Sequence, residues 1–215
     1  MRSRYNFDFL FIHSNTIADE TRRTLKPQIM NARKIFAFLD KHFSMLEQKK
    51  KTHASNVKMM ITARFINNMF AALLLIERGL LLDAFNSIRS GIEATAFYWL
   101  VCKDETTAGL YDAEKSPQPV EIRKRLEALG VDIETLHSLY AVTSKIAHVG
   151  NPYDQFQIRW EEGWDGKLLI GGGRSPDIQK ALLEDMLRAV LWFVRFDDDY
   201  VITEGKGFPE IIDRP

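Results

Sequence analysis

The sequence predicts an all-α fold, an up-and-down helical bundle with a small β-hairpin inserted before the last helix. Three observations lead to this prediction. Long stretches carry apolar residues at helical spacing, the turns between them are short, and one stretch near residue 160 changes to a two-residue period. Hydrophobic residues make up 46% of the 215 residues and charged residues 27%, which is typical of a globular protein. We therefore expect a single domain over residues 1–215.

The first predicted helix covers residues 15–50, where Ile29, Ile35 and Leu39 recur at helical spacing. Pro27 lies inside this pattern. Because proline lacks an amide donor and clashes with the preceding turn, we expect a break or a kink there. A second helix should span residues 55–77 and end near Gly79, since glycine readily takes the left-handed conformation that closes a helix.

The third predicted helix covers residues 80–102 and is apolar on nearly every side. Its large apolar side chains are Leu81, Leu82, Phe85, Ile88, Ile92, Phe97 and Leu100. A helix that is apolar all round is normally the central helix of a bundle. We therefore expect other helices to surround this segment.

The remaining elements follow a polar segment that contains prolines. A short helix, EIRKRLEALG, should end at Gly130, and the next should begin after the capping residue Asp132 and end at His148. In residues 155–170, the runs FQIRW and KLLI flank the tight-turn pair Asp165–Gly166, which predicts the β-hairpin. The last helix should cover residues 176–202, with Pro176 in its first turn.

Charge and hydropathy set the expected surroundings of the protein. Twenty-nine basic and 29 acidic residues cancel, so no global field gathers polyanions, and nucleic-acid binding would need a local basic patch. The run MFAALLLIERGLLLDAF contains Glu77, Arg78 and Asp83, which argues against a membrane span, and the N-terminal residues do not resemble a signal peptide. We therefore expect a cytoplasmic protein with no membrane partner.

The Arg89–Glu93 pair is the first candidate for a functional site. The two residues are four positions apart, so they are neighbours on one face of the third predicted helix. That helix has little other polar surface, and removing ions from water costs several kcal/mol each unless partners compensate. Two interpretations stay open: the pair specifies packing, or it lines a site. Ser90 and Gly91 lie between the two charges and would let another backbone or a ligand approach closely.

His148 is the second candidate. A histidine in the last turn of a helix can donate to an open carbonyl and is favoured by the helix dipole, so it can simply close the helix. Alternatively, it is an acid–base or phosphate-contacting imidazole that uses Arg89 or Glu93 as a partner. The candidate catalytic residues are His148, Arg89, Glu93 and Ser144, and the candidate binding residues are Tyr140, Lys145 and Ser90. No spacing of His, Cys or Glu indicates zinc, and we expect neither a metal nor a cofactor.

The stretch LYAVTSKIAHVG resembles the terminal helix motif of HEPN-type all-α domains. In that motif an arginine, a polar residue, three further residues and a histidine form an RNA-cutting site at a dimer interface. His148 matches the histidine and Ser144 the polar residue, whereas Thr143 stands where the arginine belongs. Residues 73–152, with RSGIEA and the later pattern Y-x-x-x-S-x-x-x-H, also resemble an uncharacterised bacterial family of helical bundles.

Three functions therefore compete. The leading hypothesis is a non-enzymatic regulatory or interaction module, whose partner is a second copy of the chain, another protein or a small ligand. The resemblance implies instead a HEPN-like ribonuclease or toxin of a toxin–antitoxin or phage-defence system, with RNA as its substrate and a site around His148 and Arg89. A bundle that binds a phosphate or a nucleotide without cleaving it is the third hypothesis.

Overall fold

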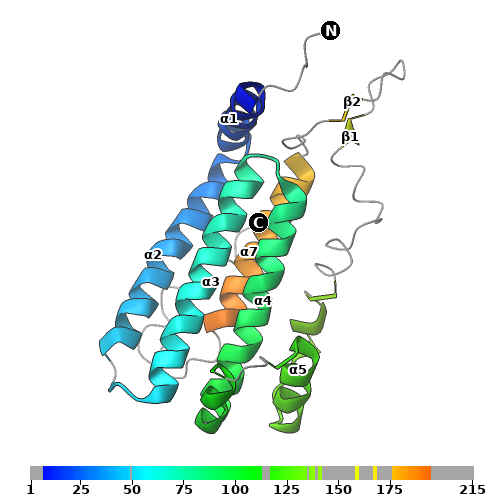
Figure 1. The fold of residues 1–215 in the computed structure, drawn as a ribbon. Helices are drawn as coiled ribbons and strands as arrows, with labels where there is room; N and C mark the ends of the chain where they lie inside the picture. The colour runs from blue at the N-terminus through cyan, green and yellow to red at the C-terminus, as the bar shows by residue number, and fades with distance from the viewer. Residues whose placement is uncertain are drawn as a thin grey trace.

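The computed structural model describes residues 7–48, 50–112, 117–134, 136–138, 140–141, 158–159, 167–168 and 176–194, and most of these residues form a helical bundle (Figure 1). Its helices are α1 (Phe7–Thr24), α2 (Lys26–Gln48), α3 (His53–Glu77), α4 (Leu81–Lys103), η1 (Glu105–Leu110), α5 (Pro119–Ala128) and α7 (Pro176–Val194), where η1 is a 3₁₀-helix. Residues 134, 136–138, 140 and 141 are helical as well. The prediction of an all-α bundle is confirmed.

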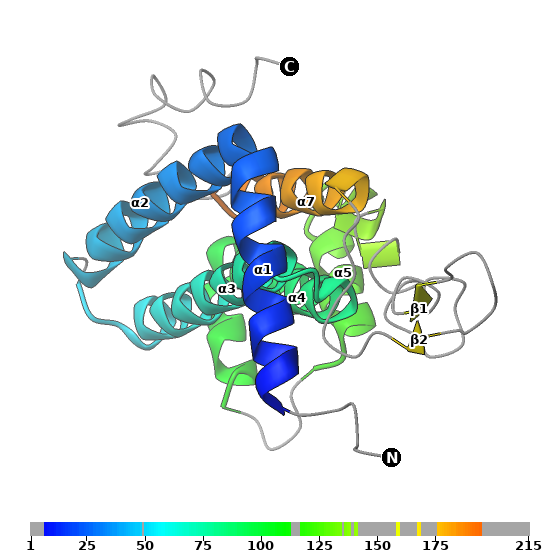
Figure 2. The ribbon, with the colours of Figure 1, turned by 90° about the horizontal axis from the view of Figure 1, so that it is seen from above.

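The first predicted helix is divided in two. α1 ends at Thr24 and α2 begins at Lys26, with Leu25 in the turn between them. Pro27 lies in the first turn of α2, where the missing amide donor would have no helical partner in any case. α2 continues along the bundle, whereas α1 crosses one end of it (Figure 2). The break expected at Pro27 is therefore confirmed.

Local signals define α3 at both ends. At its start, Thr52 and Ser55 form a capping box, in which each backbone amide donates to the other residue's hydroxyl at 2.8 and 3.1 Å. At its end, Gly79 has a φ of 72°, which lets the chain turn directly into α4. The apolar composition and length of α3 would also suffice for a membrane span. In the bundle, α3 packs against α2, α4 and α7.

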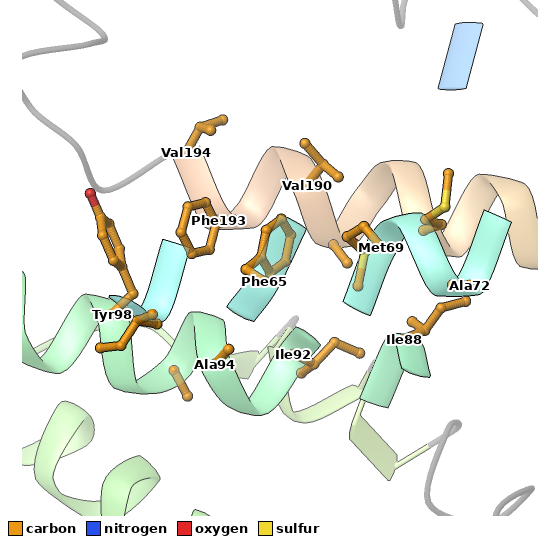
Figure 3. Packing of buried hydrophobic residues seen from close by; sticks show 14 of the residues in the cluster. Phe65, Met69, Ala72, Ile88, Ile92, Ala94, Tyr98, Val190, Phe193 and Val194 are labelled. Atoms are coloured by element: carbon orange, nitrogen blue, oxygen red, sulfur yellow. The ribbon is translucent and has the colours of Figure 1, made fainter. Parts of the chain in front are cut away.

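α4 is the central helix, as predicted. It packs against α3, α5, α7 and η1, and most of its residues are buried. The core between α3, α4 and α7 contains a group of aromatic rings (Figure 3). Phe65 and Phe193 stack at 4.1 Å between centroids, and Tyr98 lies 4.6 Å from Phe193. A Cβ at Gly91 would overlap the terminal methyl group of Met69, so this glycine lies where α4 contacts α3, and Met69 would have to move to admit a side chain there.

The direction of α7 corrects the predicted up-and-down order. Residue numbers rise in the same direction from Ile88 to Tyr98 in α4 and from Val190 to Val194 in α7, and in the opposite direction in α3 (Figure 3). The neighbouring helices α4 and α7 are therefore parallel. α4 and α7 are not consecutive in the chain, since η1, α5 and the helical residues near 140 lie between them, so the two neighbours need not be antiparallel (Figure 1).

The predicted β-hairpin insertion over residues 155–170 is wrong as an element of the fold. Within that range the structure describes only β1 (Ile158–Arg159) and β2 (Lys167–Leu168), a ladder of two antiparallel residue pairs. Two residues per strand are fewer than the three to ten that strands in globular proteins normally have, and a lone pair of strands is marginally stable at best. The described fold is thus helical throughout its core.

Candidate functional site

One face of α4 carries a line of residues on successive turns that points toward α5. Arg89, Glu93 and Phe97 are spaced four residues apart, which places them above one another on a helix. Beside Glu93 and Phe97 lies a cavity of about 180 Å³, which we name the α4–α5 pocket. Residues from three helices and the segments between them line it, among them Arg64, Glu93, Ala94, Phe97, Tyr111 and Ile122.

The walls of the α4–α5 pocket are largely apolar. Phe97 of α4 and Tyr111, which follows η1, have nearly parallel rings, with centroids 6.0 Å apart and planes inclined by 10°. Ile122 of α5 and Ala94 of α4 are buried and complete these walls. Binding sites for small molecules typically combine such an apolar lining with a few polar groups. In the α4–α5 pocket, Glu93 and Arg64 are charged residues of the lining.

Glu93 belongs to a second group of side chains, which we name the Arg89 cluster: Arg89, Glu93, Arg123 and Tyr140. Arg89 Nε donates to Glu93 Oε1 at 3.3 Å, and Arg89 Nη2 donates to Tyr140 Oη at 3.0 Å. The side chains of Arg89 and Glu93 are 27% and 26% exposed, so the pair is half-buried. Glu93 therefore belongs both to the lining of the pocket and to the Arg89 cluster.

The ring of Tyr140 is an additional partner for cations in the Arg89 cluster. The guanidinium carbon of Arg123 lies 4.3 Å from its centroid and that of Arg89 lies 5.1 Å away. Both distances are within the range of attractive cation–π contacts. Because Arg123 comes from α5 and Arg89 from α4, the tyrosine joins the two helices to the helical residues near 140. The cluster contains two positive charges and one negative charge.

The predicted site residues divide into two groups. The structure brings Arg89, Glu93 and Tyr140 into contact, and it places Ser90 half-buried on α4 but outside the lining of the pocket. Ser144, Lys145 and His148 lie outside the described residues, so the roles assigned to them stay predictions.

Arg64 and Arg123 are site residues that the sequence analysis missed. Arg64 carries the one charge between Lys58 and Glu77, and a charge inside such an apolar stretch could have drawn attention to it. Arg123 gives no comparable signal, because α5 is polar on most sides and its neighbours in space are not evident from its sequence.

Within the part of the chain that the structure describes, no group of three or more His, Cys, Asp or Glu side chains is arranged to hold a metal ion. Comparison of the chain with protein-family models, with curated proteins and with solved structures finds no match. The helical bundle and the chemistry of the α4–α5 pocket are therefore the features that bear on function.

Proposed function

We propose that the chain is a non-enzymatic regulatory module whose α4–α5 pocket binds a small molecule with an apolar body. One observation carries this proposal. Glu93 is a half-buried carboxylate on the wall of a largely apolar pocket, and Arg89 of the Arg89 cluster donates a hydrogen bond to it. A side chain held in this way can accept a hydrogen bond from a ligand with little loss of conformational entropy.

The size of the pocket limits the ligand to about one ring. An engineered apolar cavity of about 150 Å³ binds benzene, which gives a scale for the 180 Å³ of the α4–α5 pocket. Larger drug-like ligands occupy pockets of roughly 300–1,000 Å³. A monocyclic compound, or a branched aliphatic one of similar volume, fits the cavity.

The chemistry of the lining favours binding over catalysis. Among the described residues that line the pocket, the polar side chains are a carboxylate, a guanidinium and the phenol of Tyr111, with no Ser, Cys or Lys nucleophile next to a base. Arg89 already donates to Glu93 and Tyr140. The guanidinium of Arg89 is therefore engaged in structural contacts with its neighbours.

Binding of benzyl alcohol, a neutral one-ring probe, tests the proposal. We expect millimolar probe to shift the amide NMR signals of Glu93, Phe97 and Ile122. Ala94→Leu adds three carbons to the lining and should abolish these shifts, whereas Ala37→Leu makes the same change at an exposed position of α2 and should leave them. Circular dichroism verifies that both variants are folded. Absence of probe shifts in the wild type would exclude the proposed function.

A ribonuclease is the second candidate, and one contact favours it. The HEPN-type motif has an arginine where this chain has Thr143, and Arg89 of α4 reaches the neighbouring Tyr140. Incubating purified protein with RNA tests this candidate. Cleavage by the wild type that is lost in His148→Ala and in Arg89→Gln would favour the ribonuclease over the binding module.

A further inference from the structure

We propose that the ligand of the α4–α5 pocket is a small aromatic anion, and that Arg64 of α3 binds its anionic group. This inference rests on the proposed function and names the class of ligand. The ring of the ligand would pack against Phe97 and Tyr111, and its anionic group would lie at the exposed rim of the pocket beside Arg64.

Arg64 is suited to this role by its position and by its lack of other partners among the described residues. Its side chain lines the pocket from α3, and the residue is exposed, so the guanidinium lies where the cavity meets solvent. Within the described residues, Arg64 makes no ion pair and no side-chain hydrogen bond. A guanidinium is weakly hydrated and presents paired donors that match a carboxylate or phosphate.

The charge around the pocket favours an anion over a cation. Among the described residues that line the pocket, Glu93 is the one carboxylate, and Arg89 already pairs with it. Arg64 on the rim and Arg123 in the Arg89 cluster remain as positive charges, and neither pairs with a described carboxylate. An anionic group beside Arg64 would therefore gain a direct attraction to a guanidinium that a ligand cation would not.

The shape of the apolar wall favours an aromatic ring. Phe97 and Tyr111 both line the cavity, and their rings are nearly parallel with centroids 6.0 Å apart. Aromatic pairs prefer offset-stacked or edge-to-face contacts with centroids about 4.5–7 Å apart, and the pocket has room for one such ring. Ile122 covers the ring from α5.

Three probes of equal ring size and different charge test this inference: benzoate, benzyl alcohol and benzylamine. We expect benzoate to bind about tenfold more tightly than benzyl alcohol, the scale of one charge-assisted hydrogen bond, and benzylamine to bind most weakly. Arg64→Gln should weaken benzoate about tenfold and leave benzyl alcohol unchanged. Arg125→Gln, on an exposed position of α5, makes the same change in net charge and should change neither affinity. Phenyl phosphate distinguishes a preference for phosphate from one for carboxylate, and either preference supports an anion site.

The outcomes separate this inference from the proposed function. If benzyl alcohol and benzoate bind equally, the pocket binds small molecules but the anion assignment is wrong. Tightest binding by benzylamine would make Glu93 the anchor and overturn the inference. If Arg123→Gln weakens benzoate while Arg64→Gln does not, the anionic group lies at the Arg89 cluster and Arg64 is wrongly assigned. Binding of none of the probes would remove the proposed function as well.

Discussion

The Arg22–Glu77 pair and the Arg89–Glu93 pair combine the same two residue types in different surroundings. Glu77 is only 2% exposed, and its Oε2 accepts from Arg22 Nε at 2.8 Å and from Nη2 at 2.6 Å. Glu93 is 26% exposed and accepts from Arg89 at 3.3 Å. The first pair joins two helices, α1 and α3, whereas the second lies within α4.

The difference indicates that the Arg22–Glu77 pair stabilises the fold, whereas the Arg89–Glu93 pair leaves the Glu93 carboxylate able to bind a ligand. Near Glu77, the buried amide of Gln179 donates to Thr21 Oγ1 at 2.9 Å and to the carbonyl of Ile76 at 2.8 Å, so hydrogen bonds connect α1, α3 and α7 at this point. Glu93, by contrast, is one of the residues that line the α4–α5 pocket. Glu77, which is buried and held by two hydrogen bonds from Arg22, serves the packing of α1 on α3, whereas the half-buried Glu93 can still accept a hydrogen bond from a ligand.

The largest expected effect comes from removing Arg22. Arg22→Met leaves the carboxylate of Glu77 buried without its cation, and this should lower the free energy of unfolding by about 3 kcal/mol. Urea denaturation followed by circular dichroism measures the change. Arg23→Met alters the same atoms at the next, exposed position and should cost less than about 0.5 kcal/mol. Equal losses in the two variants would contradict the role of the pair.

Gln179→Leu should have the next largest effect. The substitution keeps the bulk of the side chain but removes both hydrogen bonds, and it leaves the Ile76 carbonyl without that donor in a buried region. We expect a loss of about 1–2 kcal/mol, measured as a lower midpoint in thermal unfolding. Lys180→Leu, which is exposed one position later, is the matched control. An unchanged midpoint in Gln179→Leu would show that the contact contributes nothing to stability.

Arg89→Met should cost less than either of these changes. Because Arg89 and Glu93 are half-exposed and their contact is long, the coupling between them should be below about 1 kcal/mol. A double-mutant cycle with Glu93→Gln in urea measures that coupling. A coupling energy as large as the loss in Arg22→Met would mean that both pairs serve the fold, and the contrast between them would disappear.

The smallest effect is expected at Asp185, a third carboxylate beside an arginine. Burial raises its pKa above the ordinary value, and this outweighs the opposing effect of Arg188, which donates at 3.3 Å. The folded protein therefore holds the proton to higher pH than the unfolded chain, so stability is lost as pH rises from the ordinary aspartate pKa through the raised one. Asp185→Asn should reduce this loss of stability with rising pH and slightly raise the melting temperature at pH 7. Parallel pH profiles of the two proteins would contradict the prediction.

Local patterns in the sequence predicted the helices well because their causes are local. The apolar surface of α4 and the break near Pro27 follow from side-chain periodicity and from the chemistry of proline. The direction of α7 and the extent of the β1–β2 ladder depend on how the chain returns between α4 and α7. An alternating pattern over residues 155–170 cannot report the length of a ladder, since pairing needs a partner and a surface to cover.

For the candidate site, the sequence determined which residues are neighbours within α4. Only the tertiary structure decided which residues of other helices contact them. A spacing of four residues is enough to place Arg89 beside Glu93, because one turn of a helix separates them. The contacts of Tyr140 and Arg123 and the position of Arg64 on the pocket join α3, α4, α5 and the helical residues near 140. Contacts between helices depend on their packing angles and on the path of the chain, and no local pattern contains that information.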